Sequence, residues 1–167
     1  MRISSALEST VRQSDQHALI DALLKDEAAA GKAAASGHIY HGFSRGSANS
    51  YAVAVLDGAD DQRWMTRYIA NSGAWSSSNV PPPPVKDVLD AGSTTALSNT
   101  EFYIYYGLQD HDPSQNGETA QKNAAKIVQQ LGGSVKLVEN PEGCHSTFLN
   151  GGMSDFAFDA LLWAVAP

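Results

Sequence analysis

The sequence predicts an α/β fold, in which a parallel sheet of about four strands has helices on both faces. Two observations lead to this prediction. Short runs of β-branched or aromatic residues alternate with longer stretches of helical periodicity, and turn residues mark the boundaries between them. That alternation is typical of βαβ units with right-handed crossovers. The length of 167 residues suits one domain with a hydrophobic core, so we treat residues 1–167 as a single domain.

The helices and strands follow from local patterns. From about Ser14 apolar residues recur at helical spacing, Asp15 can cap, and alanines favour helix until Gly37. Short β-branched or aromatic runs predict strands at residues 38–43, 67–71, 102–106 and 135–139. Helix-compatible or amphipathic segments predict helices at residues 48–56, 119–131 and 156–165.

The connection from Gly73 to Glu101 breaks the alternation. It includes three serines at residues 76–78 and four prolines at residues 81–84, and prolines do not fit a helix interior or a central strand. We expect an extended polyproline linker on the surface. A lid beside a pocket is the alternative.

Composition narrows the classes of protein. Hydrophobic residues make up 43% and charged residues 17% of the chain, which is typical of globular proteins, and no apolar run approaches the roughly 20 residues that span a bilayer. The net charge of -7 and the scattered basic residues disfavour nucleic acid as a partner. We therefore expect neither a nucleic-acid nor a membrane partner. The single cysteine, Cys144, excludes an internal disulfide, and the absence of a signal-peptide pattern leaves localisation open.

Residues 42–46 read Gly-Phe-Ser-Arg-Gly and match the G-x-S-x-G pattern. In that pattern a serine sits on a strained turn between a strand and a helix, and the glycines allow the backbone to approach closely. So short a pattern is weak evidence alone. Here a predicted strand runs into it and small residues follow it, which is the required context. We therefore predict Ser44 as a nucleophile, against the alternative of an ordinary Gly-Ser loop.

Asp110 and His145 follow Ser44 in the chain order Ser, Asp, His, which is the order used by catalytic triads built on a G-x-S-x-G turn. Each comes just after a predicted strand, so all three residues belong to the carboxyl edge of a parallel sheet. There His145 can take the Ser44 proton, and Asp110 can orient and stabilise the imidazole. Asp112, two residues further along, is the alternative acid; we prefer Asp110 because it comes first after the strand.

Other chemistries have weaker support. Cys144 could act as a nucleophile with His145, but adjacent side chains usually point in opposite directions. His38 and His41 are three residues apart and would fall on opposite faces of a strand, which disfavours a shared metal. The Asp-His-Asp run at residues 110–112 offers cation ligands, yet nothing in the sequence supplies the remaining ones. We predict no metal and no cofactor.

Four segments resemble the α/β-hydrolase superfamily and, within it, its serine-esterase branch. They are GFSRGSANSY at 42–51, RYIANSGAW at 67–75, FYIYYGLQDHD at 102–112 and GCHSTF at 143–148. The resemblance runs from about residue 15 to the end. It implies the C-terminal half of that fold, from the nucleophile-elbow strand to the final helix, and hydrolysis of a small-molecule carboxylic ester through an acyl-enzyme. It also implies that Trp75 is a pocket-wall, substrate-binding residue; core packing is the alternative.

The resemblance also implies features that we do not expect here. The family's fold has more strands before the elbow, whereas only about 40 residues precede Ser44. The family's oxyanion hole uses the backbone N–H of Arg45 and a second donor from an upstream loop, and we expect only the first. The elbow strand becomes a sheet edge. Two functions therefore stay open: a serine esterase, and a truncated, non-catalytic remnant or interaction module that pairs through that edge, for instance with a second copy.

Overall fold

A parallel sheet forms the centre of the molecule. The computed structural model describes residues 5–32, 34, 37–75, 80–111, 117–149 and 155–166, with side chains described from residue 13 onward. In these residues four strands pair in the order β1-β2-β3-β4, and every neighbouring pair is parallel. The strands are β1 (His38–Phe43), β2 (Met65–Asn71), β3 (Glu101–Gly107) and β4 (Ser134–Asn140).

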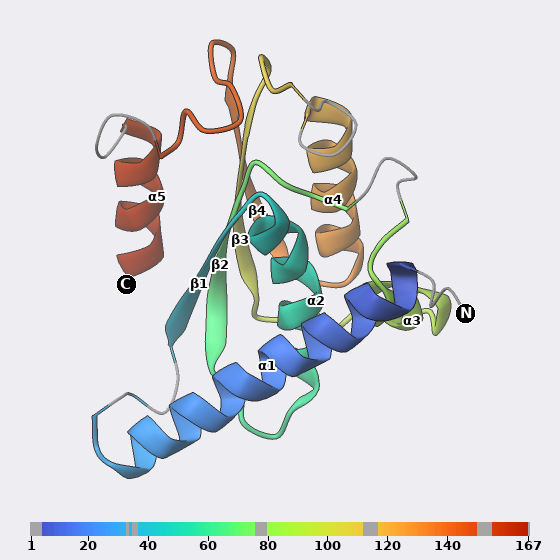
Figure 1. Ribbon diagram of the computed structural model, residues 1–167, viewed down its shortest axis with the longest axis vertical. Helices are drawn as coiled ribbons and strands as arrows, with labels where there is room; N and C mark the ends of the chain where they lie inside the picture. Colours follow the sequence, from blue (N-terminus) through green and yellow to red (C-terminus); the bar gives the residue numbers. More distant parts are fainter. Residues whose placement is uncertain are drawn as a thin grey trace.

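Helices alternate with these strands and cover both faces of the sheet (Figure 1). They are α1 (Ser5–Ala29), α2 (Arg45–Ala59), α3 (Pro83–Asp90), α4 (Glu118–Gln130) and α5 (Asp155–Val165). Helices α2, α3 and α4 lie on one side of the sheet, where α1 packs on α2, and α5 lies on the other. The predicted α/β fold with about four parallel strands is confirmed. No helix in the described part of the chain is long and apolar enough to cross a bilayer.

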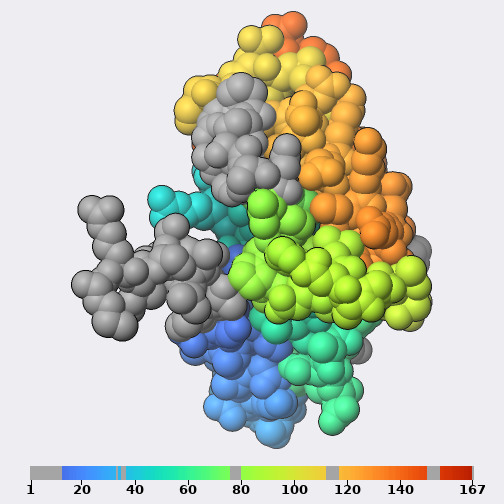
Figure 2. Space-filling view, turned by 90° about the vertical axis from the view of Figure 1, so that its right-hand side faces the viewer, coloured from blue at the N-terminus to red at the C-terminus, as the bar shows by residue number. Residues whose placement is uncertain are grey.

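The proline-rich connection differs from the prediction. We expected an extended linker, but α3 begins at Pro83. Pro82 is its N-cap, and Pro83 and Pro84 occupy the first two helical positions, where a missing N–H removes no helical hydrogen bond. Val85 then packs into the core with 1% exposure, and Figure 2 shows α3 (yellow-green) as a band between α4 (orange) and α1 (blue). Ser76–Ser78 of this connection lie outside the described residues.

Aromatic side chains form the core on each face of the sheet. On the α2 face, the Phe102 ring stacks between Tyr51 and Tyr68, with ring centroids 5.2 and 5.0 Å away. On the α5 face, Tyr105 packs against Phe148 at 5.0 Å. Residues of β3 from Phe102 to Gly107 are all buried, as expected for a central strand covered on both faces. The sheet is therefore a rigid base for the loops at its carboxyl edge.

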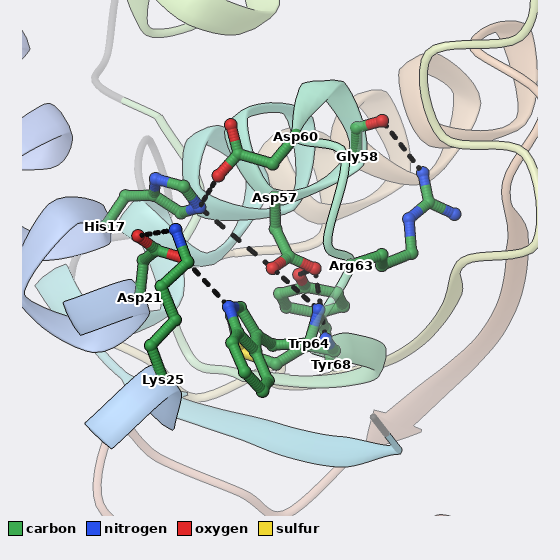
Figure 3. A network of polar contacts seen from close by, with 10 residues as sticks. His17, Asp21, Lys25, Asp57, Gly58, Asp60, Arg63, Trp64 and Tyr68 are labelled. Atoms are coloured by element: carbon green, nitrogen blue, oxygen red, sulfur yellow. Dashed lines mark hydrogen bonds and ion pairs between the residues drawn. The ribbon is translucent and has the colours of Figure 1, made fainter. Parts of the chain in front are cut away.

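A polar network fixes α1 and α2 to the amino end of the sheet (Figure 3). The Asp57 carboxylate accepts hydrogen bonds from the backbone N–H groups of Trp64 at 3.1 Å and Met65 at 3.0 Å. The Trp64 indole donates to Asp21 of α1 at 2.9 Å. His17 of α1 approaches Asp57 to 4.0 Å. Two helices and the start of β2 thus meet around one buried carboxylate.

Strand β1 lies at an open edge of the sheet, since the described chain pairs it only with β2. This edge position is the one expected for residues 38–43. The strand carries no Lys, Arg or Pro, the residues that commonly protect an edge from pairing, and Ile39 and His41 are exposed on it.

Candidate active site

Ser44 occupies a strained turn between β1 and α2. Its φ of 56° and ψ of -114° lie outside the regions that ordinary residues favour. Its backbone N–H donates to the carbonyl of Asn71 at 2.9 Å, which ties the turn to the end of β2. Serine usually caps a helix through its side chain, yet the Ser44 side chain makes no cap hydrogen bond to α2. The Ser44 hydroxyl therefore does not serve as a helix cap, which is the role that serine most often plays at this position.

Two glycines permit the close backbone contacts of this turn. A Cβ on Gly42 would lie 2.2 Å from the carbonyl oxygen of Gly46, and a Cβ on Gly73 would lie 2.0 Å from that of Ser44. Real Cβ atoms do not approach so closely, so both positions need glycine. Gly46, the second glycine of the motif, differs, because a Cβ there would meet nothing within 4 Å. The predicted close approach thus requires a glycine at only one of the two motif positions.

Asp110 and His145 are in direct contact. His145 Nδ1 lies 2.8 Å from Asp110 Oδ2, and the two side chains are 20% and 1% exposed. With Nδ1 as the donor to the carboxylate, Nε2 is the nitrogen left to accept a proton. The sequence placed these residues after two neighbouring strands, and the fold brings them to hydrogen-bond distance.

Backbone contacts hold the loops after β3 and β4 side by side. The Gln109 N–H donates to the Gly143 carbonyl at 2.8 Å, and a Cβ on Gly107 would lie 2.1 Å from that same oxygen. The Asn140 side chain donates to the Tyr105 hydroxyl at 3.0 Å and accepts from the Glu142 N–H at 3.1 Å. Sequence reasoning missed Gly107, Gly143 and Asn140. Their place at the ends of predicted strands was the available signal.

Ser44 follows the carboxyl end of β1, and because neighbouring strands are parallel this end lies on the same sheet edge as the ends of β3 and β4, which precede Asp110 and His145 (Figure 1). The Phe43 ring, one residue before Ser44, packs against the His145 ring at a centroid distance of 4.9 Å. Among the described residues no hydrogen bond joins Ser44 to His145. Such bonds are often long in ligand-free enzymes and tighten when substrate binds.

The remaining predicted residues occupy different surroundings. Arg45 is the first residue of α2, so its backbone N–H has no acceptor within the helix. It lies at the N-terminus of the helix, where the helix dipole favours anions.

Trp75 is 4% exposed and packs edge-on against Tyr51 at 5.0 Å within the core of the α2 face. This burial favours the core-packing alternative for Trp75 over the pocket wall. Asp112, the alternative acid, lies outside the described residues.

Two further residues border the pair. The exposed Cys144 thiol lies 3.2 Å from the Thr147 hydroxyl, and this hydrogen bond lowers the pKa of the thiol. Its partner is thus a threonine rather than His145, which disfavours a Cys144 nucleophile. His111 Nδ1 lies 3.6 Å from Asp110 Oδ1, and the ring stands edge-on to that of His145 at 5.1 Å. Asp110, His111 and His145 together could hold a metal ion.

The comparisons with known proteins give solved structures but no match to a family model or a curated protein. One matching structure comes from a study of two fungal esterases from Rhizomucor miehei, with a TM-score of 0.66 and 12% identity, over 91% of this chain and 57% of that chain. Esterase PE8 matches at 0.62 and 18% identity, over 98% of this chain and 66% of its own. A protein from Klebsiella pneumoniae that is named as a dienelactone hydrolase matches at a TM-score of 0.59 and 17% identity, over 90% of this chain and 59% of its own. The chain therefore has the α/β-hydrolase fold, and it spans between 57% and 66% of the length of these proteins.

Proposed function

We propose that this chain is a serine hydrolase that cleaves carboxylic esters through a Ser44–His145–Asp110 triad. The observation that carries the proposal is the contact of 2.8 Å between His145 and the buried Asp110, at the same sheet edge as the strained turn of Ser44. A histidine oriented by a buried carboxylate can act as a general base. The matched structures include proteins named as esterases and one named as a dienelactone hydrolase, which supports an ester or a lactone as the substrate class.

The proposed reaction has two halves. His145 Nε2 takes the proton of Ser44 Oγ while that oxygen attacks the ester carbonyl, and the Arg45 N–H stabilises the oxyanion. His145 then returns the proton to the departing alkoxide, which leaves an acyl group on Ser44. A water molecule, deprotonated by His145, releases the carboxylic acid and restores the hydroxyl. Asp110 holds the imidazole in the required tautomer and stabilises the imidazolium in both halves.

The oxyanion hole limits the expected rate. Arg45 supplies one backbone donor, and the loss of a second donor typically lowers kcat by about 10²–10³-fold. If Arg45 acts alone, turnover is slow rather than absent. Activated esters with a good leaving group are therefore the substrates to test first.

Hydrolysis of p-nitrophenyl acetate tests the proposal, with the wild type compared to Ser44→Ala and His145→Ala. We expect each change to lower kcat/KM by at least about 10³-fold, because nucleophile and base act as a unit. Ser134→Ala is the matched control: Ser134 is an exposed serine at the amino end of β4. Retention of full activity by Ser44→Ala would rule the proposal out.

A second candidate function is pairing with a second copy of the chain. It rests on helix α5, which is apolar on two sides. One side, with Ala160 and Ala164, packs on the sheet, whereas four large apolar residues at helical spacing are exposed: Phe158, Leu161, Leu162 and Val165. A helix face formed by large apolar residues normally packs against another surface. The open β1 edge presents unpaired backbone groups in the same molecule.

We propose that β1 and α5 of one chain meet those of another in a symmetric dimer, with or without catalysis. Sedimentation velocity tests this idea with the wild type and a Leu161→Asp variant. We expect a dimer that the variant dissociates. A wild-type monomer at high protein concentration would refute it.

A further inference from the structure

Three side chains with metal-binding atoms converge at the carboxyl edge of the sheet. They are Asp110 and His111, after β3, and His145, after β4, and their ligand atoms all lie within 4.8 Å of one another. From the sequence alone, no further metal-binding side chain could be assigned to the Asp-His-Asp run at residues 110–112. The fold supplies that ligand, because His145 comes from the neighbouring loop.

We propose that Asp110, His111 and His145 form a binding site for Zn²⁺, and that the bound ion blocks ester hydrolysis. Two imidazoles and a carboxylate suit zinc, whereas Mg²⁺ and Ca²⁺ require mostly oxygen ligands. Three protein ligands and a water molecule would complete a tetrahedral shell.

The spacing of the ligands is close to what zinc requires. Bonds of about 2.0–2.2 Å in a tetrahedron place ligand atoms roughly 3.3 Å apart. Asp110 Oδ2 is 2.8 Å from His145 Nδ1, and Asp110 Oδ1 is 3.6 Å from His111 Nδ1. These two distances run to different oxygens of the Asp110 carboxylate, and one ligand atom from each of the three residues lies within 4.8 Å of the others. The His111 side chain is 75% exposed, so it can turn toward an ion held by Asp110 and His145.

The surroundings hold the other two ligands in place. The Asp110 side chain is 1% exposed and that of His145 is 20% exposed, so both are fixed by packing. The hydrogen bond from Gln109 N–H to the Gly143 carbonyl joins their loops. The site is thus pre-formed on its inner side and open to solvent at His111.

The proposed inhibition by zinc rests on the proposed serine-hydrolase function, whereas the proposed zinc binding does not. During catalysis the Nδ1–H of His145 must donate to Asp110 while Nε2 exchanges a proton with Ser44. A zinc ion on Nδ1 replaces that hydrogen and occupies the carboxylate. The imidazole then cannot become the imidazolium that the reaction needs, so zinc and acyl transfer exclude each other.

Metal binding is tested first, on protein without a histidine tag. Calorimetric titration with Zn²⁺ and the visible spectrum of the Co²⁺ form are measured for wild type, His111→Ala and His38→Ala. His38 is the matched control, because it lies at the amino end of β1, where it contacts the Ala34 carbonyl. We expect one zinc ion per chain, at least about tenfold weaker binding in His111→Ala, and unchanged binding in His38→Ala. No binding by the wild type at millimolar Zn²⁺, or equal affinity in His111→Ala, would overturn the site.

Hydrolysis of p-nitrophenyl acetate with and without Zn²⁺ then tests inhibition. Each variant is compared with itself, and EDTA should restore activity. We expect inhibition in the concentration range where zinc binds, displaced to higher concentration in His111→Ala. Zinc binding that leaves Ser44-dependent hydrolysis unchanged would overturn the inhibitory step. A chain without esterase activity would contradict the proposed function alone, since the titration still decides the metal site.

Discussion

Two buried aspartates in this molecule lie close to histidines, yet their surroundings differ. Asp57 is 0% exposed, and its oxygens accept from the backbone N–H groups of Trp64 and Met65, while His17 stays 4.0 Å away (Figure 3). Asp110 is 7% exposed, and an imidazole nitrogen of His145 lies 2.8 Å from it. The first pair joins helices at the amino end of the sheet. The second lies at the carboxyl edge.

The difference lies in what each carboxylate binds. A backbone N–H does not exchange its proton with a carboxylate near neutral pH, so the two N–H groups that Asp57 engages contribute to the stability of the fold. An imidazole exchanges its proton near neutral pH, so a carboxylate that binds it can influence a reaction. Burial beside a histidine is therefore a poor guide to a catalytic site. The hydrogen-bond partner of the carboxylate and the end of the sheet at which it lies are better guides.

The largest expected effect is the loss of activity in Asp110→Asn. We expect kcat/KM for p-nitrophenyl acetate to fall by about 10³–10⁴-fold, because the amide no longer holds the required imidazole tautomer. Thermal unfolding should remain close to that of the wild type. Asp112→Asn serves as the comparison for the alternative acid. A large loss in Asp112→Asn together with an active Asp110→Asn would reverse the assignment.

The carboxyl edge of the sheet, where Ser44 lies, should also be sensitive to a single methyl group. Gly42→Ala places a Cβ 2.2 Å from the Gly46 carbonyl oxygen, and we expect a loss of at least about 3 kcal/mol in the free energy of unfolding. Gly46→Ala meets open space in α2 and should retain wild-type stability or gain up to about 1 kcal/mol. Urea denaturation measures both. Equal stability of the two variants would contradict the close contact in this turn.

At the amino end of the sheet we expect the reverse of the Asp110→Asn result, namely a loss of stability without a loss of activity. Asp57→Ala leaves two buried backbone N–H groups without their acceptor, and we expect a loss of about 2–3 kcal/mol in the free energy of unfolding. Activity per folded molecule should stay within about twofold of the wild type, since Asp57 is remote from Ser44. Urea denaturation and active-site titration separate the two quantities. An activity loss as large as that of Asp110→Asn would remove the contrast between the two aspartates.

The smallest effect concerns pH. Burial raises the pKa of the Asp57 carboxyl above its ordinary 3.8, and the N–H groups of Met65 and Trp64 oppose the shift only in part. The folded state then binds this proton more tightly than the unfolded state. Its contribution to stability is present below pH 3.8 and is lost as the pH rises through the folded-state pKa. We expect the stability of wild type relative to Asp57→Asn to fall over that range. A rise would mean that His17 and Arg63 stabilise the anion more than burial penalises it.

Sequence patterns predicted the sheet well because its strands are strongly marked. The run from Phe102 to Tyr106 is fully buried, and such a run of aromatic residues has few other stable placements. The helix at Pro83 was missed because prolines are unfavourable inside a helix but favourable in its first turn, and the sequence does not say which position they take.

The site was predictable only in part. Ser44, Asp110 and His145 follow from motif, chain order and strand ends. The role of Trp75 and the proximity of His111 to His145 depend on how loops and helices pack, which no local pattern specifies. The same holds for positions 107 and 143, where the requirement for glycine becomes apparent only once the two loops are in contact.

The most direct test of the central claim is to react the folded chain with a fluorophosphonate and to locate the modified residue by peptide mass spectrometry. A fluorophosphonate reacts with a serine that a neighbouring base activates, so it reports on nucleophile and base together. We predict one phosphonylated residue, Ser44, and no labelling of Ser44→Ala or His145→Ala. Labelling at another residue, or none on a folded wild-type protein, would contradict the claim that this chain builds a working nucleophile.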